Sequence, residues 1–374
     1  MNILLTNSTD IFAGGEDYVL ILARYLIRRG HSVWVSALPG HLLLKKCEAS
    51  QIPTIPIAYT GMERVFAVSL QLRKEARLRS IDIVHSNANY DRTCAAIAAG
   101  FSSVRHIAGV HSAHSIQHNI THWMRNRFGT DHFIADAQAV KDVLVHHDGV
   151  DPSNITVVPI GVEQDPQDVM QRARKRVREE MGISPETIVV GNVARLVPFK
   201  GHSYLLQSIA EVVRQAPCSL FLIIGDGELR DDLGAQAARL GITDHVRFLG
   251  FRDDLDLLYP VFDIYCHSSV ELAAEAFPLA ILRALATGLP IACTNVGGIG
   301  MMVVEGVSGH LTRPEDSHAL AEALLHIIMD QELRASMGRE SEALFQRDFH
   351  ASAMANNVER VYLNAMSSRG TEAP

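Results

Sequence analysis

The chain has 374 residues, a net charge of −8 and 47% hydrophobic residues. This length predicts two domains, and the apolar content allows substantial cores, which excludes a disordered protein apart from the tail from about 367 to 374. The negative charge argues against a general nucleic-acid binder, because such proteins are usually basic.

The cysteines and the first residues indicate the compartment. Five scattered cysteines without a Cys-x-x-Cys motif indicate buried thiols in a reducing environment. The segment 1–6 lacks the charged n-region and the length of a signal peptide, and no apolar run is long enough to span a bilayer. We therefore expect a cytoplasmic protein.

Short apolar runs alternate with longer helical patterns along the chain. The runs that predict strands lie near Ile3, Val33, Ile83, Ile107, Phe133 and Val157, and then near Val189, Leu222, Val246, Ile264 and Ile291. Strands that alternate with helices form parallel sheets with helices on both faces. The pattern predicts an α/β protein with two Rossmann-like domains, whose ligands bind beyond the carboxyl ends of the strands.

The polar segment 163–171 predicts the domain boundary, with an N-terminal domain over 1–163 and a second domain over 164–348. The charged segment 172–180 that follows predicts a helix with a solvated face. A last helix, within a C-terminal segment 349–374, spans about 351–365 and places one apolar stripe on one side. The stripe consists of Met354, Val358, Val361 and Ala365.

Gly14 and Gly15 stand between the first strand and its helix. Glycine there lets a ligand approach the backbone, although a flexible turn is the alternative and no full dinucleotide fingerprint is present. His111 follows the strand 104–110, where a ligand-facing residue belongs. His114, His118 and His122 continue at helical spacing. Without an acidic or cysteine partner, this series indicates a helix face rather than a metal site.

The segment 193–201, VARLVPFKG, places two cations between a strand and a helix. Arg195 can hold phosphate oxygens with two hydrogen bonds, whereas Lys200 is a compact point charge. A helix N-terminus with neighbouring cations suits a diphosphate, and the alternative is a pair of surface cations.

The segment 275–290, EAFPLAILRALATGLP, places Glu275 ahead of a helix that starts near Pro278. The N–H groups of Phe277 and Leu279 are then free to bind a ligand. A carboxylate in this position suits sugar hydroxyls, and the alternative is a simple helix-end charge.

These segments resemble the retaining glycosyltransferases of family 4, also called glycosyl transferases group 1. Further matching segments follow in the family's order: GG (14–15), GHSV (30–33), NITVVPIGVE (154–163), IIGDGEL (223–229) and VRFLGF (246–251). The resemblance covers most of the chain. It implies the GT-B architecture, with two Rossmann-like domains whose parallel sheets face a deep interdomain cleft. It also implies an acceptor-binding first domain, a nucleotide-sugar-binding second domain and a last helix that returns to the first domain.

The resemblance implies transfer of a sugar from a nucleoside-diphosphate sugar to a cell-envelope glycan or glycolipid, as in lipopolysaccharide or exopolysaccharide biosynthesis. The donor would be a UDP-sugar or GDP-sugar, and no metal or other cofactor is implied. Catalytic roles fall on His111, Glu275, Arg195 and Lys200, and donor binding adds Gly14, Gly15, Phe251, Ala276, Phe277, Leu279 and Arg283. Two rivals stay open: a sugar-nucleotide epimerase with the same fold, and a binding or regulatory subunit without turnover.

Arg283 departs from the family pattern, which has a second glutamate at this position. That glutamate accepts hydrogen bonds from the ribose hydroxyls, whereas arginine can only donate to them. We therefore expect weaker affinity for a plain nucleoside diphosphate than is usual in the family. Ile160 is a second departure, since the family usually has asparagine there.

Two segments mix apolar and cationic residues, 64–79 and 123–128. Such segments either rest on anionic lipid, here at the inner face of the cytoplasmic membrane, or form ordinary packed helices. The pair Asp254 and Asp256 is interpreted as solvated.

Overall fold

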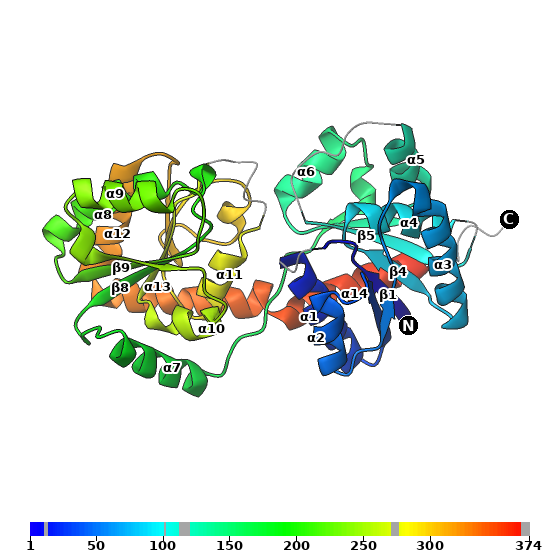
Figure 1. Ribbon diagram of the computed structural model, residues 1–374, viewed down its shortest axis with the longest axis horizontal. Helices are drawn as coiled ribbons and strands as arrows, with labels where there is room; N and C mark the ends of the chain where they lie inside the picture. Colours follow the sequence, from blue (N-terminus) through cyan, green and yellow to red (C-terminus); the bar gives the residue numbers. More distant parts are fainter. Residues whose placement is uncertain (11–13, 101, 112–119, 271–276, 368–374) are drawn as a thin grey trace. The chain divides into compact units, whose positions relative to one another are not determined.

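The computed structural model describes residues 1–10, 14–100, 102–111, 120–270 and 277–367 (Figure 1). The chain divides into two compact units. The first combines Met1–Val162 with Ala351–Pro374, and the second is Glu163–His350.

The first unit contains a seven-stranded parallel sheet within the described residues, in the order β3-β2-β1-β4-β5-β6-β7. Its strands are β1 (Asn2–Thr6), β2 (Ser32–Ala37), β3 (Thr54–Pro56), β4 (Ile83–Ser86), β5 (Arg105–Val110), β6 (His132–Ala135) and β7 (Ile155–Val157). Its helices are α1 (Gly14–Arg28), α2 (Leu42–Ala49), α3 (Val65–Leu78), α4 (Asn89–Ala99), α5 (Ile120–Phe128), α6 (Gln138–His146) and α14 (Ala351–Ser367).

The second unit contains a six-stranded parallel sheet in its described part, in the order β10-β9-β8-β11-β12-β13. Its strands are β8 (Ile188–Val193), β9 (Ser219–Ile224), β10 (Val246–Gly250), β11 (Ile264–His267), β12 (Ile291–Thr294) and β13 (Gly309–Thr312). Its helices are α7 (Gln167–Glu180), α8 (His202–Gln215), α9 (Arg230–Arg239), α10 (Leu255–Leu258), α11 (Leu279–Ala286), α12 (Ser317–Met329) and α13 (Gln331–Leu344), followed by a π-helical turn, η8 (Phe345–Phe349).

The central strands are buried along their whole length. β5, β9, β11 and β12 have no exposed residue. The strands are buried because helices cover both faces of each sheet. Their sequences are therefore continuous apolar runs and do not alternate between apolar and polar residues. The predicted α/β class with two Rossmann-like parallel-sheet domains is confirmed.

The last helix, α14, belongs to the first unit, where it packs against α1 (Figure 1). The predicted stripe of Met354, Val358, Val361 and Ala365 is buried, as expected. On the same helix, the hydroxyl of Tyr362 lies 2.6 Å from Nδ1 of His85 in β4. Glu359 contacts His31 at 2.7 Å and also pairs with Arg29, so both apolar and charged contacts attach this helix.

The charged helix α7 differs from the prediction of a solvated face. Arg178 is only 7% exposed, and both Arg174 and Arg178 donate to the carbonyl of Val261. Both guanidinium groups also pair with Asp263, at 2.5 Å and 3.2 Å. The prediction is therefore wrong for these two residues, because a guanidinium carries enough donors to satisfy the carbonyls of a buried turn.

Four cysteines are buried and free, namely Cys47, Cys94, Cys266 and Cys293. Burial raises the pKa of the Cys266 thiol to about 12, which keeps it inert. Cys218 is exposed, so the prediction of buried thiols is wrong for this one residue. Within the described ranges, no helix combines the length and the apolar character needed to cross a membrane.

Candidate functional site

The loop after β8 carries the two predicted cations, and the neighbouring strand β9 holds its backbone. The N–H of Ala194 donates to the carbonyl of Ile224 at 3.0 Å, and the N–H of Leu196 donates to that of Asp226 at 3.0 Å. On its other side, the N–H of Val270, just after β11, donates to the carbonyl of Phe199 at 2.9 Å. The loop is thus fixed between the carboxyl ends of two neighbouring strands.

Two glycines allow this close backbone packing. Gly201 has a φ of +66°, and a Cβ there would lie 2.0 Å from the carbonyl oxygen of Ser268. Gly225 has a φ of +134°, and a Cβ there would lie 1.9 Å from the carbonyl oxygen of Ala194. Both the left-handed backbone and the lack of space exclude other residues at these positions.

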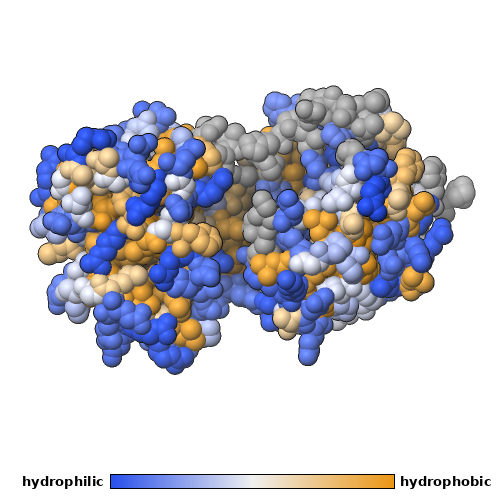
Figure 2. Space-filling view, viewed as in Figure 1, coloured by the Kyte–Doolittle hydropathy of each residue, from blue (hydrophilic) through white to orange (hydrophobic). Residues whose placement is uncertain are grey.

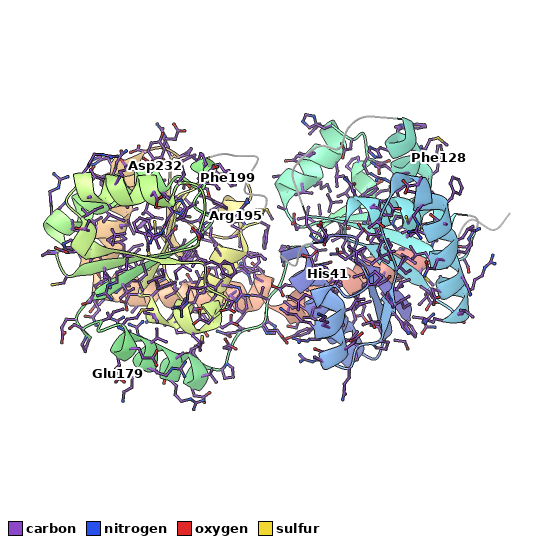
Figure 3. All side chains as sticks on the ribbon, viewed as in Figure 1. His41, Phe128, Glu179, Arg195, Phe199 and Asp232 are labelled. Atoms are coloured by element: carbon purple, nitrogen blue, oxygen red, sulfur yellow. The ribbon has the colours of Figure 1, made fainter. Side chains whose placement is uncertain are left out.

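Arg195 and Lys200 both lie close to the same aromatic ring. The Cζ atom of Arg195 lies 5.7 Å from the ring centroid of Phe199, and Nζ of Lys200 lies 5.4 Å from it (Figure 3). Arg195 is exposed and Lys200 is half-buried, and α8 begins two residues after Lys200. The arrangement places two cations and a helix N-terminus together, which suits an anion with several oxygens.

A buried histidine lies directly beneath this loop. His202 is 1% exposed, and its Nε2 lies 3.1 Å from Oδ1 of Asn192 at the end of β8. Burial, together with His267 and Lys200, lowers the pKa of His202 to about 4. The ring is therefore neutral at pH 7, and it connects α8 to the sheet. Sequence reasoning missed both residues, although an asparagine inside an apolar strand was an available signal.

The second predicted motif is only partly described. Pro278 precedes α11, which begins at Leu279, so the predicted helix start is confirmed. Glu275 and Ala276 lie outside the described residues. The side chain of Phe277 is 8% exposed and packs on Phe349 at a centroid distance of 5.9 Å. Only main-chain groups of Phe277 and Leu279 are therefore suited to a ligand, because the first N–H groups of a helix have no intrahelical acceptor.

Phe251 follows β10 and is 78% exposed, which is unusual for a large aromatic side chain. The carbonyl of Gly250 accepts from the N–H of Gly225 at 2.8 Å. This bond joins the end of β10 to the end of β9, and β9 neighbours the strand that leads into the Arg195 loop. The exposed ring of Phe251 therefore lies at the same edge of the sheet as that loop, where a flat ligand could stack on it.

Arg283 pairs with an acidic residue of its own unit, Asp256 of α10. Asp165 also lies near this pair. Its pKa is raised by burial and by Asp256, and Arg283 acts in the opposite direction. The neighbouring Asp254 is held by Arg252 at 2.5 Å, which lowers the pKa of Asp254. Asp254 and Asp256, interpreted from the sequence as solvated, are thus both ion-paired.

In the first unit, His111 follows β5 as predicted, and polar groups surround it. Its Nε2 lies 3.3 Å from Oδ1 of Asn87, and its Nδ1 lies 3.6 Å from Oδ2 of Asp136. Nδ2 of Asn87 donates to the carbonyls of Thr6 and His85, so its oxygen faces the histidine. The ring of Tyr18 packs on His111 at 4.6 Å between centroids.

Asp136 is the acidic member of this group, and sequence reasoning missed it. The residue is 2% exposed, and its Oδ1 has no hydrogen-bond partner among the residues that the structure describes. Burying a carboxylate costs free energy unless a hydrogen bond or an opposite charge offsets the loss of water. The contact with His111 therefore contributes to the stability of Asp136 in this position. Its position after the end of β6 was a usable signal, because polar residues at that edge of a sheet face ligands.

Gly14 and Gly15 open α1. Within the described part of the chain, a Cβ on Gly15 would meet nothing within 4 Å, so the backbone there leaves room for a ligand. Of the histidine series, His114 and His118 lie outside the described residues. Across the part of the chain that is described, no group of three or more histidine, cysteine or acidic side chains is arranged to hold a metal ion.

Two family models match this chain, and their ranges together cover most of it. The model for glycosyltransferase family 4 matches residues 12–165, and the model for glycosyl transferases group 1 matches residues 173–343. The chain belongs to glycosyltransferase family 4. Its two-sheet architecture is the GT-B fold that the sequence predicts.

This family 4 protein has relatives among characterised and solved proteins. A D-inositol 3-phosphate glycosyltransferase of Corynebacterium glutamicum is 32% identical over 238 residues, which cover 61% of this chain and 56% of the relative. The match thus spans little more than half of the relative's length. A glycosyltransferase of Rickettsia africae superposes with a TM-score of 0.86, 18% identity and 98% coverage of both chains. Anabaena HepE in complex with UDP superposes with a TM-score of 0.82 and 22% identity, over 97% of this chain and all of that one. At such low identities, these two structures establish the fold.

Proposed function

We propose that this family 4 protein is a retaining, metal-independent glycosyltransferase that uses a UDP-sugar or GDP-sugar as donor. The observation that carries the proposal is the fixed loop after β8, which places both Arg195 and Lys200 close to the ring of Phe199 beside the start of α8. A departing nucleoside diphosphate develops negative charge. Preorganised cations stabilise that charge without needing a metal ion. The related Anabaena protein has been solved with UDP, which supports a nucleotide-sugar donor.

In the proposed reaction, an acceptor hydroxyl attacks the anomeric carbon from the face on which the diphosphate departs, so the configuration is kept. Arg195 and Lys200 bind the diphosphate. His111 contacts the donor sugar, and Glu275 contacts its hydroxyls. Phe251 offers its exposed ring to the base. We further propose that the acceptor is a cell-envelope glycan or glycolipid.

The experiment that tests the donor proposal is turnover of the purified chain with a panel of UDP-sugars and GDP-sugars, with and without EDTA. Transfer or slow donor hydrolysis that survives the chelator supports the proposal. The anomeric configuration of the product, read by NMR, tests retention. Activity that EDTA removes and a divalent ion restores would contradict metal independence.

A glycolipid acceptor is supported by the surface of the first unit. α3 and α5 both pack on α4, and their outward sides carry Phe66, Leu70 and Leu78, and Trp123, Met124 and Phe128 (Figure 2; Phe128 is labelled in Figure 3). Exposed cations accompany them, namely Arg64, Lys74, Arg77 and Arg127. Exposed apolar side chains interleaved with cations suit an anionic lipid surface.

Cosedimentation with vesicles tests this surface. Phe66→Ser and Phe128→Ser should reduce binding to vesicles that contain anionic lipid, and neutral vesicles should bind weakly. Met329→Ser is the matched control, because Met329 is 68% exposed but belongs to α12 of the second unit. If Met329→Ser reduces vesicle binding as much as the other two variants, the surface of the first unit is not a specific lipid-binding site.

A further inference from the structure

Asp91 is a buried carboxylate that the proposed reaction does not use. It lies in the first turn of α4 and is 0% exposed. Its Oδ2 accepts from the hydroxyl of Thr6 at 2.6 Å and from the N–H of Asn87 at 3.0 Å. Its Oδ1 accepts from the hydroxyl of Ser8 at 2.7 Å. Burial raises the pKa of Asp91, and these hydrogen bonds act in the opposite direction. Among the described residues Asp91 forms no ion pair, so hydrogen bonds alone offset its burial.

The hydroxyl of Ser8 belongs to the loop that follows β1 and leads to the glycine pair at the start of α1. Oγ of Ser8 donates to Asp91 and also accepts from the main-chain N–H of Asp91 at 3.2 Å. A second buried carboxylate holds the same loop. Nδ2 of Asn7 donates to Oε1 of Glu16 at 2.9 Å, and Glu16 is 2% exposed. The first residues of the loop are therefore attached both to α4 and to α1.

Asn87 connects the carboxylate of Asp91 to His111. The main-chain N–H of Asn87 donates to Asp91, and its side-chain Nδ2 donates to the carbonyl of Thr6 at 3.0 Å. These bonds leave Oδ1 of Asn87 facing Nε2 of His111 at 3.3 Å. Gly109 leaves room for this contact, since a Cβ there would lie 2.8 Å from Oδ1 of Asn87 and 3.1 Å from Nε2 of His111. The position of His111 thus depends on Asn87, and that of Asn87 depends on Asp91.

These contacts lie at the edge of the sheet that faces ligands. β1, β4 and β5 are neighbouring parallel strands (Figure 1). Thr6, Asn87 and His111 stand at or just after the carboxyl ends of these strands. Ligands of parallel α/β sheets bind outside this edge. The single carboxylate of Asp91 therefore fixes the loop after β1 and the support of His111 relative to each other.

We propose that Asp91 is a positioning residue for sugar transfer, which fixes Asn87, and through it His111, relative to the loop after β1. This inference rests on the proposed function, and it adds a residue that acts on the reaction without touching a substrate. Loss of Asp91 should lower kcat. The affinity for UDP or GDP should change little, because Arg195 and Lys200 belong to the second unit.

The number of acceptors predicts how two substitutions differ. Asp91→Ala removes both oxygens, so the N–H of Asn87 and the two hydroxyls lose this acceptor. In Asp91→Asn, one oxygen is left to accept from the N–H of Asn87, and the amide NH2 group can only donate, as it could to Oγ of Ser8. The bonds to a neutral amide are also weaker than those to a charged carboxylate. Asp91→Asn should therefore retain part of the activity that Asp91→Ala loses.

Asp82 provides a matched control for a carboxylate that only joins strands. Its Oδ2 accepts from the main-chain N–H of Asn2 at 2.7 Å, so it joins the start of β1 to the residue before β4. Asp82 thus links the same two strands as Asp91, but at their amino ends and away from His111. Asp82→Ala should lower the melting temperature without a change in kcat.

The test is steady-state kinetics of the full chain with the best donor of the UDP-sugar and GDP-sugar panel, together with calorimetric titration of UDP and GDP. We expect Asp91→Ala to lower kcat by about tenfold and Asp91→Asn by a few-fold. In a His111→Ala background, Asp91→Ala should have less than about a twofold further effect, because residues that act through the same group are not additive. Melting temperatures show whether each variant folds, and Asp91→Asn keeps the test valid if Asp91→Ala does not fold.

The cycle with His111 separates this inference from the proposed function. If an Asp91 variant lowers kcat by the same factor with and without His111, or if Asp82→Ala lowers kcat equally, Asp91 does not act through the histidine. Normal kcat in the folded Asp91 variants would overturn the inference too. In these cases the native chain still binds nucleotide and turns over the donor, so the proposed function stands. If the native chain does neither, or if His111→Ala transfers sugar at the normal rate, the proposed function fails in whole or in its use of His111, and the role of Asp91 fails with it.

Discussion

The loop after β8 in the second unit and His111 at the end of β5 in the first unit are both candidate parts of the site, but they are held in opposite ways. The first is fixed by its backbone, through Gly201, Gly225 and bonds to β9, while Arg195 stays exposed. The second is fixed by buried side chains, since His111 lies between Asn87 and Asp136 and packs on Tyr18.

This difference has a physical reason. A diphosphate brings its own charge, so the protein needs exposed cations on a rigid backbone and little else. A sugar is neutral and polar, and it is oriented by side chains whose own positions are fixed by buried hydrogen bonds. We therefore expect substitutions in the second unit to affect nucleotide binding by altering the loop's geometry or its charge. Substitutions in the first unit should affect catalysis by displacing His111, and the stability of this unit should depend on pH.

Breaking the backbone support of the loop should have the largest effect. In Gly201→Ala, the new Cβ would lie only 2.0 Å from the carbonyl oxygen of Ser268. The alanine would also have to adopt the left-handed φ of +66°. We expect a loss of about 3 kcal/mol or more in the free energy of unfolding, together with loss of nucleotide binding. Gly241→Ala is the control, because its φ is +68° with nothing within 4 Å. It should cost about 1 kcal/mol. Equal effects in chemical denaturation would show that the clash at Ser268 is unimportant.

Removal of the cations should come next. Arg195→Ala and Lys200→Ala should each reduce transfer by about 10²-fold with little change in melting temperature, since both charges serve the departing diphosphate. Arg239→Ala, an exposed cation at the end of α9, is the control for net charge. Steady-state kinetics at saturating donor provides the measurement. Near-normal rates in both loop variants would exclude the proposed role of the loop.

Positioning in the first unit predicts a smaller effect on catalysis. Asp136→Asn removes the charge that faces Nδ1 of His111 at 3.6 Å but keeps the side chain's shape. We expect kcat to fall by about tenfold while KM for the donor changes little, because the histidine is misplaced rather than lost. Asp131→Asn is the control, because it breaks an ion pair with Arg105 whose atoms are 2.6 Å apart. This pair lies away from His111, so kcat should be unchanged. A fall in kcat of similar size for both variants would indicate general destabilisation.

The sequence predicted the strands of both units about equally well, since it missed one edge strand in each. Strands β8 to β12, the start of α11 and the two cations beside α8 follow from local patterns of apolar runs, Pro278 and glycine. β3 and β13 were missed because both are short edge strands, one with Pro56 and the other opening at Gly309. Edge strands bury less surface and leave a weaker apolar signal.

The side-chain network of the first unit could not be predicted, because its members are far apart in the sequence. Tyr18, Asn87, His111 and Asp136 come from four different segments, and Tyr362 from a fifth. Only the register of the parallel sheet and the return of α14 bring them together. The burial of Asp91 is invisible for the same reason, since an acidic residue in the first turn of a helix normally predicts a surface position.

Mild acid should distinguish the two units. In the first unit, burial lowers the pKa of His85 to about 3 and that of His106 to about 4, whereas in the second unit it lowers that of His202 to about 4. An unfolded histidine titrates near 6.5, so the unfolded chain binds more protons below that pH, and stability falls as the pH falls from about 6.5 toward 4. Between pH 7 and 5.5 each histidine should cost about 1 kcal/mol. With two such strongly shifted histidines against one, the first unit should lose more stability than the second.

Hydrogen exchange followed by mass spectrometry measures this difference strand by strand. Protection of β4 and β5 should decrease more than that of β8 and β9 when the pH is lowered to 5.5, after correction for the intrinsic exchange rate. Equal or greater loss in the second unit would show that the buried histidines do not determine acid stability.

The smallest effect concerns Arg283, where the family pattern has a glutamate. The guanidinium is paired with Asp256, and both side chains are partly exposed, so the pair should contribute only about 0.2–1 kcal/mol to stability. Because Arg283 already forms an ion pair with Asp256, it has fewer donors left for a nucleotide. We therefore expect Arg283→Ala to change the affinity for UDP or GDP by less than tenfold. A double-mutant cycle with Asp256→Ala, measured by denaturation and by calorimetric titration, separates the two roles. If Arg283→Ala alone weakens nucleotide binding by more than tenfold while Asp256→Ala strengthens it, the arginine is a nucleotide ligand, and Asp256 competes with the nucleotide for it. If both variants bind the nucleotide normally, other groups of this chain contact the ribose. Those groups would then take the role of the missing glutamate at the carboxyl edge of the sheet, where Phe251 and Arg195 also lie.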